Sequence, residues 1–349
     1  MKRCQRCVLP GTYPGIVFNE HGVCNRCLSH EPFHCLGEDA LRQVLESCRN
    51  RGPWDCLVPM SGGSDSTYVA YRLVRDYGMK VLGYHYDNHF IAPIARGNLA
   101  RIENLLGIEI VRESSRLDTR LKRLFIRLNL HKSPLHLLFA FCHGCPDAIW
   151  GGARRIARQK RIPLVISSES REEDASYKRT LWDRVKPSPR EKIRWAARMP
   201  ANFALRKCLG RLLEWRYPRP KSWKNPEKIE YFAYRKQDRP AMLSVLTREV
   251  GWEHPSGNYP WRFDCLIHPV VEQMTFNLLG MTEKDDLFSV LIREGQMDRR
   301  EALTILESWE GRRKEQLPLI EGVLKRLGLD VAERSRVLRY CEKGIWSGA

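Results

Sequence analysis

The chain has 349 residues, which is long enough to bury a sizeable core and to form about two domains. Its formal net charge of +18 favours a polyanionic partner, such as nucleic acid, an anionic membrane surface or a phosphate-bearing substrate. No stretch approaches about 20 uninterrupted apolar residues, and the N-terminus lacks the apolar run of a signal peptide, so we expect a cytoplasmic protein. Twelve cysteines in a chain of this length do not fit a secreted disulfide scaffold.

The first 37 residues are rich in cysteine, glycine and proline and have almost no helical period. Such a segment cannot form an apolar core of its own and needs a cross-link. It contains two Cys-x-x-Cys pairs, separated by a linker rich in turn-forming residues, and this spacing is typical of tetrahedral thiolate coordination. We therefore predict a zinc-ribbon-like segment over residues 1–37, in which a structural Zn²⁺ is bound by Cys4, Cys7, Cys24 and Cys27.

Residues 38–177 alternate between helical and strand patterns. Helical spacing occurs at 38–51, 67–74, 98–106 and 148–160, and short apolar runs typical of buried strands occur at 56–60, 80–86, 109–111 and 163–168. The order strand, helix, strand implies right-handed βαβ units. The sequence therefore predicts an α/β domain with a parallel, Rossmann-like sheet.

A Ser-Gly-Gly-Ser-Asp-Ser loop, residues 61–66, follows the first of these strands and begins a helix. Small residues at such a turn let backbone amides approach a phosphate, and the helix N-terminus adds partial positive charge. The hydroxyls of Ser61 and Ser66 can donate to the same phosphate, whereas the Asp65 carboxylate would oppose an anion unless it bound Mg²⁺. A serine-capped turn is the structural alternative.

The pattern favours a PP-loop of the N-type ATP pyrophosphatase class, which binds Mg-ATP and forms AMP and pyrophosphate. The expected nucleotide contacts are Ser61, Gly62, Gly63, Ser64, Asp65 and Ser66, of which Ser61, Asp65 and Ser66 are the expected catalytic residues.

Two further polar pairs follow strands at their carboxyl ends, where open α/β sheets bind ligands. Asp87 and Asn88 follow the second strand, and either nucleotide contact or turn capping would explain them. Ser168 and Glu169 follow the later strand at 163–168, and Glu169 could bind Mg²⁺ or the ribose, or only cap a helix. We include all four among the candidate nucleotide contacts.

The rest of the chain divides into a basic segment and a helical region. Between Lys178 and Lys228 there are 16 Lys or Arg against four acids, interleaved with four tryptophans. This segment, residues 178–235, is a candidate for binding RNA, an anionic membrane surface or a partner enzyme, and a solvated charged face is the alternative. Residues 236–349 have mostly helical patterns.

Several separated stretches resemble a known family. They are Cys4-x-x-Cys7-Val8-Leu9-Pro10 with residues 14–27, the loop at 61–66, Tyr86-Asp87-Asn88-His89-Phe90 with Asn98-Leu99, Phe141-Cys142-His143-Gly144-Cys145, Ile162-Pro163-Leu164-Val165, and residues 291–297 with 301–303. On these stretches the chain resembles the N-acetyl sugar amidotransferases of the PP-loop superfamily. It departs from them at Ser64, where a lysine is common, and at Ser168-Glu169-Ser170, where Gly-Glu-Asn is frequent.

The resemblance implies a fold and a two-protein reaction. The fold is a PP-loop core of the adenine nucleotide alpha-hydrolase-like type, with an N-terminal zinc ribbon and a helical C-terminal region. In the reaction, ATP adenylates the acetamido oxygen of a nucleotide-linked or lipid-linked N-acetyl sugar, and ammonia then replaces that oxygen. The product is an acetamidino sugar for a surface polysaccharide such as the lipopolysaccharide O-antigen. A partner similar to the glutaminase and cyclase pair of imidazole glycerol-phosphate synthesis would supply the ammonia.

The pair Cys142 and Cys145 leaves other interpretations open. It could bind zinc, carry out redox chemistry, or lie buried against the sheet. In sulfur-transferring relatives of this class a similar pair and one distant cysteine hold an iron–sulfur cluster, and Cys265 or Cys208 could be that third ligand here. Sulfur transfer to tRNA or to a small molecule is therefore one alternative function, and a non-catalytic zinc-containing RNA-binding protein is another.

Overall fold

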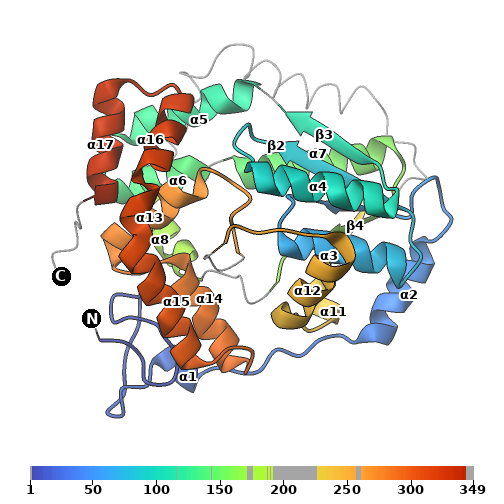
Figure 1. The fold of residues 1–349 in the computed structure, drawn as a ribbon, viewed down its shortest axis with the longest axis horizontal. Coiled ribbons are helices and arrows are strands. Elements are labelled where there is room, and N and C mark those ends of the chain that lie inside the picture. Colours follow the sequence, from blue (N-terminus) through green and yellow to red (C-terminus); the bar gives the residue numbers. More distant parts are fainter. Residues whose placement is uncertain are drawn as a thin grey trace.

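The structure, a computed structural model, describes residues 2–114, 116–142, 144–170, 176–186, 188, 190–191, 226–256 and 261–342. Its centre is a sheet in the order β3-β2-β1-β4-β5, in which every neighbouring pair is parallel (Figure 1). The strands are β1 (Cys56–Pro59), β2 (Val81–Asp87), β3 (Ile110–Ser114), β4 (Leu164–Ser167) and β5 (Glu227–Glu230). The predicted α/β class with a parallel sheet is confirmed.

Helices cover both faces of the sheet. In Figure 1, α3 (Ser64–Arg75) and α4 (Pro93–Leu106) lie in front of the strands and α7 (Cys145–Gln159) lies behind them. Successive strand residues point to opposite faces, so Val58 joins the core with α3 and α4, whereas Leu57 joins the core with α7. Burial on both faces explains why the strand sequences are uninterrupted apolar runs.

The strand order reverses next to β1. From β1 the chain builds β2 and β3 on one side, and then crosses to add β4 and β5 on the other. In open α/β sheets, ligands bind outside the carboxyl ends of the strands at the point where the order reverses. The loop at 61–66 follows β1 and residues 168–170 follow β4, so both stretches lie at this point.

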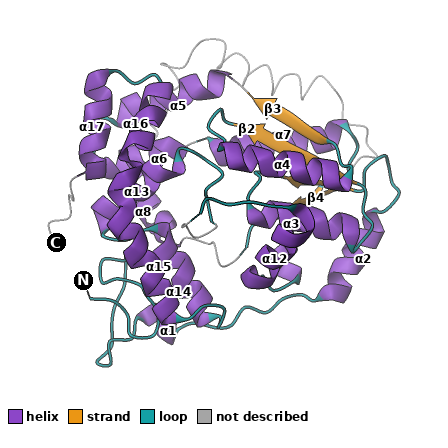
Figure 2. Ribbon diagram, viewed as in Figure 1, coloured by secondary structure: helices purple, strands orange, loops and turns teal. Residues whose placement is uncertain are grey.

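A second core lies beside the sheet and is entirely helical (Figure 2). Residues 116–142, for which the sequence predicts no element, form α5 and α6 and pack there with helices from the C-terminal region. The predicted helical character of that region is confirmed. The helices beside the sheet are α5 (Arg116–Asn129), α6 (Pro134–Cys142), α13 (His268–Leu279), α14 (Glu283–Arg293), α15 (Arg299–Arg312), α16 (Leu317–Arg326) and α17 (Val331–Glu342), with a 3-10 turn at Arg313–Gln316.

Most of the remaining elements contribute residues to the core of the sheet. They are α1 (Asn25–Leu28), α2 (Glu38–Cys48), α8 (Ser176–Val185), α11 (Tyr231–Tyr234), α12 (Arg239–Val245) and a π-helical turn at Leu246–Val250. Most of the basic segment, including 192–225, lies outside the described residues. The last part of the predicted segment 178–235 belongs to the sheet and not to a separate insert. It contains β5, which pairs with β4 as an edge strand. None of the helices in the described ranges combines the length and the apolar composition needed to cross a membrane.

Candidate active site and cysteine centre

The loop after β1 is held in shape by its own side chains. The Ser61 amide donates to Ser66 Oγ at 3.3 Å, and the Gly63 amide donates to Ser61 Oγ at 3.2 Å. Thr67 Oγ1 donates to the Gly63 carbonyl at 2.7 Å. Within the described residues, no side chain caps the N-terminus of α3, which begins at Ser64. The loop therefore presents the positive end of a helix at the edge of the sheet where ligands bind.

Gly62 is required by the geometry of this loop. Its φ is +84°, and a Cβ built on it would lie 2.2 Å from the Ala95 carbonyl oxygen on α4. The Gly62 carbonyl accepts two hydrogen bonds, from Asn98 Nδ2 at 3.2 Å and from Trp252 Nε1 at 3.1 Å. The loop is thus held against α4 and the segment after α12 at the one position that no side chain can occupy.

We expect Gly62→Ala to destabilise the protein by about 2 to 4 kcal/mol, because the left-handed backbone and the clash with Ala95 both oppose a side chain. Gly63→Ala is the matched control. Its φ is −74°, and the only close neighbour of its added Cβ is Ser61 Oγ at 3.2 Å. Chemical denaturation of the two variants measures the difference. Equal midpoints would show that the loop tolerates a side chain at 62.

Asp65 lies beside a buried guanidinium group. Its Oδ2 is 3.5 Å from Arg239 Nη2, and its Oδ1 accepts a hydrogen bond from Ser64 Oγ at 3.0 Å. The Arg239 side chain is 6 % exposed and lies at the start of α12, where Asp238 caps the helix by accepting from the Ala241 amide at 3.0 Å. The helix therefore brings a fixed positive charge to the loop.

Two buried polar groups lack partners within the described residues, one close in sequence to Arg239 and the other after β4, the strand beside β1. Gln237, two residues before Arg239, is 1 % exposed, and both atoms of its side-chain amide lack a hydrogen-bond partner within the described residues. Ser170 Oγ, just after β4, is also buried and lacks a partner there. Leaving such a group unpaired costs about 1 to 3 kcal/mol, a cost that a bound polar ligand would offset.

Asp87 and Asn88 shape the turn after β2. Asp87 Oδ1 accepts from the His89 amide, and Asn88 Oδ1 accepts from the Phe90 amide, both at 2.8 Å. Asp87 also lies 3.4 Å from Arg96 on α4. The structure therefore shows the turn-capping role of both residues, and their contact with a nucleotide stays a prediction.

Ser168 and Glu169 lie at the carboxyl end of β4, as predicted. Glu169 Oε2 accepts from Ser167 Oγ at 3.2 Å and from Lys228 Nζ, on β5, at 3.0 Å. Lys228 in turn lies over the ring of Trp150 on α7. Glu169 therefore already has a cationic partner, and its contact with Mg²⁺ or ribose stays a prediction.

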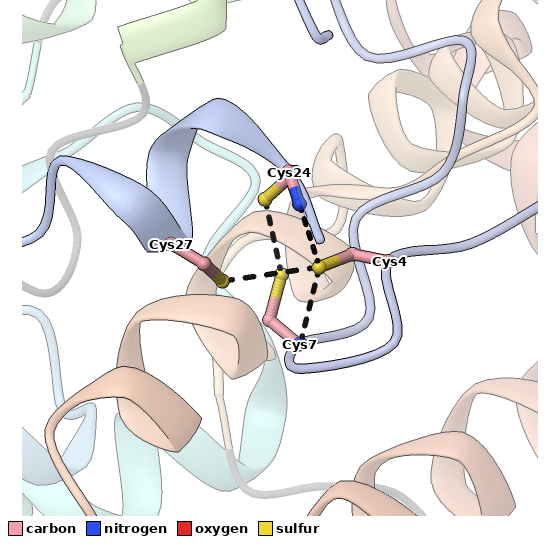
Figure 3. A group of neighbouring side chains, drawn as sticks. All are labelled: Cys4, Cys7, Cys24 and Cys27. Carbon is pink, nitrogen blue, oxygen red and sulfur yellow. Dashed lines mark hydrogen bonds between the residues drawn. The ribbon is translucent and has the colours of Figure 1, made fainter. Parts of the chain in front are cut away.

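The four N-terminal cysteines converge on one point (Figure 3). All are buried, and their sulfurs lie within 4.8 Å of one another. Cys4 Sγ lies 3.9 Å from Cys27 Sγ, and Cys7 Sγ lies 3.8 Å from Cys24 Sγ. These separations are too long for disulfides, whose bond is about 2 Å, and match the edge of a tetrahedron with metal–sulfur bonds of about 2.3 Å, which is about 3.8 Å. The predicted grouping is confirmed, and the donor set fits a metal ion.

The chemistry of the cluster also favours a cation. Contacts with the Cys24 and Cys7 sulfurs, and then burial, raise the pKa of the Cys27 thiol. A metal ion supplies the positive charge that lets several thiolates share one buried site. The amides of Cys7 and Cys24 point at Cys4 Sγ, at 3.5 and 3.2 Å, and would support its negative charge.

The cysteine segment is bound to the C-terminal helices. Arg299, the first residue of α15, donates to the carbonyls of Cys4 and Cys7 at 2.9 and 3.0 Å. Arg3 forms an ion pair with Asp285 on α14. The cysteine centre is therefore an internal support of the fold rather than a freely attached module.

Asp286 lies buried in the first turn of α14, and burial raises its pKa from 3.8 to about 7. Between these values the folded state retains a proton that the unfolded chain releases, so stability falls as the pH rises from about 4 through 7. We expect Asp286→Asn, which is neutral at every pH, to lose this dependence. The full pKa difference between the folded and unfolded states corresponds to a free energy of unfolding about 4 kcal/mol higher in the variant above pH 7.

Denaturant unfolding at pH 4 and pH 8.5 tests this expectation, because wild type and Asp286→Asn should be much closer in stability at the lower pH than at the higher. An equal difference in the free energy of unfolding between the two proteins at both pH values would show that Asp286 is ionised in the folded state throughout this range.

Cys142 and Cys145 lie at a junction between helices. Cys142 ends α6 and is exposed, and Cys145 begins α7. The buried Lys122 donates to Cys145 Sγ at 3.3 Å and to the Phe141 carbonyl at 2.6 Å. A lysine ammonium and a helix N-terminus both favour negative charge on a nearby sulfur.

The structure does not bring Cys142 and Cys145 together with a third described ligand at metal-binding distances. Cys265, a candidate third ligand, accepts from Asn88 Nδ2 at 3.4 Å. Among the described residues, the only group of three or more ligands at metal spacing is the N-terminal one, so Cys142, Cys145 and Cys265 do not meet in this way. Cys208, the other candidate, lies outside the described residues.

Three residues at the loop carry no assigned role in the sequence predictions: Asn98, Arg239 and Trp252. Trp252 is 190 residues from the Gly62 carbonyl that it contacts, and Asn98 is 36 residues away. Only Asn98 lies in a stretch that matches the resembled family. No local signal marks the other two, because their role depends on the packing of α12 and the following segment against α3.

Comparison with known proteins assigns no family to this chain. No family model matches the chain, and no curated protein matches it. Among solved structures, the chain is similar to the U34-tRNA thiolase NcsA from Methanococcus maripaludis with its 4Fe-4S cluster, with 12% identity, a TM-score of 0.34 and coverage of 100% of this chain and 99% of that chain. It is also similar to NMN synthetase from Francisella tularensis, with 12% identity, a TM-score of 0.38 and coverage of 80% and 93%. Because both TM-scores lie below 0.5, we infer nothing about activity from either.

Proposed function

We propose that this protein is an ATP-dependent enzyme of the PP-loop class that forms AMP and pyrophosphate. The observation that carries the proposal is the Ser61–Ser66 loop, which opens α3 at the point where the strand order of a parallel sheet reverses. Gly62 brings the backbone of this loop close to α4, and the first turn of α3 faces the same edge. A triphosphate with its positive counter-ion suits such a site.

The residues around the loop can be given roles toward ATP. The amides of the first turn of α3 and the serine hydroxyls bind phosphate oxygens, and Arg239 balances the charge of pyrophosphate as it leaves. Asp65 with neighbouring phosphate oxygens provides the oxygen ligands that Mg²⁺ prefers, and Mg²⁺ would neutralise charge on the phosphates. The unpaired amide of Gln237 could bind the edge of the adenine base.

We further propose that the group adenylated is the acetamido oxygen of an N-acetyl sugar. This oxygen attacks the α-phosphorus of ATP, the bond to the β-phosphate breaks, and pyrophosphate leaves. Ammonia then adds to the activated carbon, AMP leaves with the oxygen, and two protons are released to solvent or to the product amidine. An amide oxygen is a poor leaving group until it is adenylated, so the two steps depend on each other.

The amidotransfer proposal is supported by two sequence stretches of the resembled family that lie far apart in the chain. Glu294 Oε1, in the stretch 291–297, accepts from the Phe33 amide at 3.2 Å and lies 2.7 Å from His30 Nε2, just beyond the cysteine segment. Lys236 Nζ donates to the Glu294 carbonyl at 3.3 Å, and Lys236 is three residues from Arg239. Two of the family stretches also pack together, because Val8 and Leu291 lie in one apolar cluster. A partner glutaminase would supply the ammonia.

The test is an assay of pyrophosphate and AMP with ATP, Mg²⁺, an ammonium salt and a series of phosphate-linked acetamido sugars. We expect one AMP for each amidine formed, with the amidine identified by mass spectrometry as replacement of oxygen by NH. Omitting ammonium should stop amidine formation. ATP cleavage that proceeds equally without any acetamido sugar would contradict amidotransfer.

Sulfur transfer is the second candidate, favoured by the contact between Lys122 and Cys145. A nucleophilic sulfur in place of ammonia would attack the carbon that bears the adenylated oxygen, and AMP would leave with that oxygen. Thiolation of bulk tRNA with sulfide, run beside the amidine assay, discriminates between the two. Iron and sulfide in protein purified without oxygen would favour this candidate, whereas zinc alone would favour a structural Zn²⁺ at the N-terminal cysteines.

A further inference from the structure

A second concave site lies where the turn after β2 meets the helical body. It is a cavity of about 370 Å³ lined by His89, Phe90, Thr119, Arg120, Arg123 and Arg326. The lining comes from three separate parts of the fold: the turn after β2, α5, and the end of α16. The volume lies within the usual range for small-molecule sites, about 300 to 1,000 Å³.

Among the described residues that line this cavity, the charged side chains are of one sign. None of its described lining residues is acidic, and three are arginines from two helices. Across the described residues, Arg120, Arg123 and Arg326 have no carboxylate within ion-pair distance, although many other arginines of the chain have one. Three guanidinium groups without a counter-charge around one cavity favour an anionic ligand.

Two of the arginines, Arg123 and Arg326, are held in place without being neutralised. Arg123 Nε donates to the Leu327 carbonyl at 2.8 Å, which orients its guanidinium. The Arg326 guanidinium lies 5.2 Å from the centre of the Phe90 ring, a cation–π contact that leaves its charge in place. Such supports reduce the entropy lost when a ligand binds.

Two further polar groups of the cavity lack partners. His89 Nε2 and Thr119 Oγ1 are buried, and neither has a hydrogen-bond partner within the described residues. His89 has a φ of +66°, which is uncommon for a residue other than glycine, and its amide donates to Asp87 Oδ1. A ligand with several acceptor oxygens would satisfy both side chains and the arginines together.

The cavity is connected to the ATP loop by a short piece of chain. Phe90 is followed closely by α4, whose Ala95 carbonyl abuts Gly62 and whose Asn98 holds the Gly62 carbonyl. Both sites lie at the carboxyl edge of the sheet, after β1 and after β2, which are adjacent parallel strands. A ligand anchored in the cavity therefore lies at the same edge of the sheet as the loop.

We infer that this cavity binds the phosphate or diphosphate group that links the acetamido sugar to its carrier. The inference rests on the proposed function and adds to it the site that anchors the substrate. The carrier can be a nucleoside or a lipid, since both attach the sugar through the same anionic group. A cavity of this volume suits one such group and its neighbouring atoms better than the continuous backbone of RNA.

The test measures binding to the full-length protein without ATP, so that it does not depend on catalysis. The probes are UDP-N-acetylglucosamine, N-acetylglucosamine linked through diphosphate to farnesol, neutral N-acetylglucosamine and bulk tRNA. The variant is Arg120→Ala with Arg326→Ala, two exposed side chains without ion pairs, and the matched control is Lys325→Ala, next to Arg326 on α16. Isothermal calorimetry gives Kd for each, and ATP binding and thermal unfolding confirm an intact fold.

We expect the wild type to bind at least one diphosphate-linked sugar, and to bind neutral N-acetylglucosamine much more weakly. The double variant should lose at least about tenfold in affinity for the diphosphate-linked sugar, whereas Lys325→Ala and the Kd for ATP should be unchanged. Which of the two linked sugars binds identifies the carrier.

Several outcomes would overturn the inference: equal binding of linked and neutral sugars, no binding of either linked sugar, or wild-type affinity in the double variant. If the double variant loses affinity for bulk tRNA and for no other probe, the cavity is an RNA contact. If linked sugars bind through Arg120 and Arg326 but no amidine forms with ATP and ammonium, the proposed function fails and the inference about the anion stands. If amidine forms at the wild-type KM in the double variant, the inference alone fails.

Discussion

Asp65→Asn should release pyrophosphate about 100 to 1,000 times more slowly than the wild type, the range typical for loss of one preorganised charge-stabilising group. Asparagine keeps the volume of the side chain and one carbonyl oxygen, but it lacks the charge that would bind Mg²⁺ and that faces Arg239 at 3.5 Å. Initial rates of pyrophosphate release measured over a Mg²⁺ titration test this expectation. The variant should need more Mg²⁺ for half its maximal rate.

The control for this variant is Asp76→Asn, at the other end of the same helix. Asp76 follows α3 and forms an ion pair with Arg72, so it is also a carboxylate paired with an arginine, more exposed than Asp65 and about 18 Å along the helix from the loop. It should keep the wild-type rate and Mg²⁺ dependence. Thermal unfolding separates a chemical effect from loss of the buried pair with Arg239. An Asp65→Asn enzyme that is folded and fully active would exclude the PP-loop proposal.

The features that could be predicted from the sequence are those set by local pattern. The loop at 61–66 could be placed because it combines an apolar run, two glycines and a helical period within about 20 residues. The cysteine cluster could be placed because its four ligands occur in two short pairs. In both cases, the residues that determine the feature are neighbours in the chain.

The features that could not be predicted depend on packing between distant segments. Trp252 and Arg239 reach the loop only because α12 packs against α3, and nothing in their own sequence indicates it. The helix α6 is apolar on most sides because it is buried in the helical body, so it has no amphipathic period to read. By contrast, α5 has apolar residues at helical spacing, at Leu121 and Phe125, and its period could have been recognised.

Cys24→Ser should remove the metal from the N-terminal centre and unfold the segment that it holds. Four buried sulfurs lie within 4.8 Å of one another, an arrangement that a metal ion explains. The binding free energy of a structural zinc site, on the order of 10 kcal/mol, is folding free energy for such a segment. We expect about one zinc per chain in the wild type and almost none in the variant, with much faster proteolysis within residues 1–37. Metal analysis by mass spectrometry and limited proteolysis measure both.

Cys35→Ser is the matched control, because Cys35 lies near the same segment, is exposed and does not belong to the cluster. It should keep the wild-type zinc content and protease resistance. Because residues 36 and 37 donate backbone hydrogen bonds to α11, and Lys236 lies between α11 and Arg239, loss of zinc should also weaken ATP binding, though less than Asp65→Asn lowers the rate. A Cys24→Ser protein that retains one zinc would show that the cluster is not the zinc site. Zinc loss without faster proteolysis would show that contacts such as those of Arg299 hold the segment by themselves.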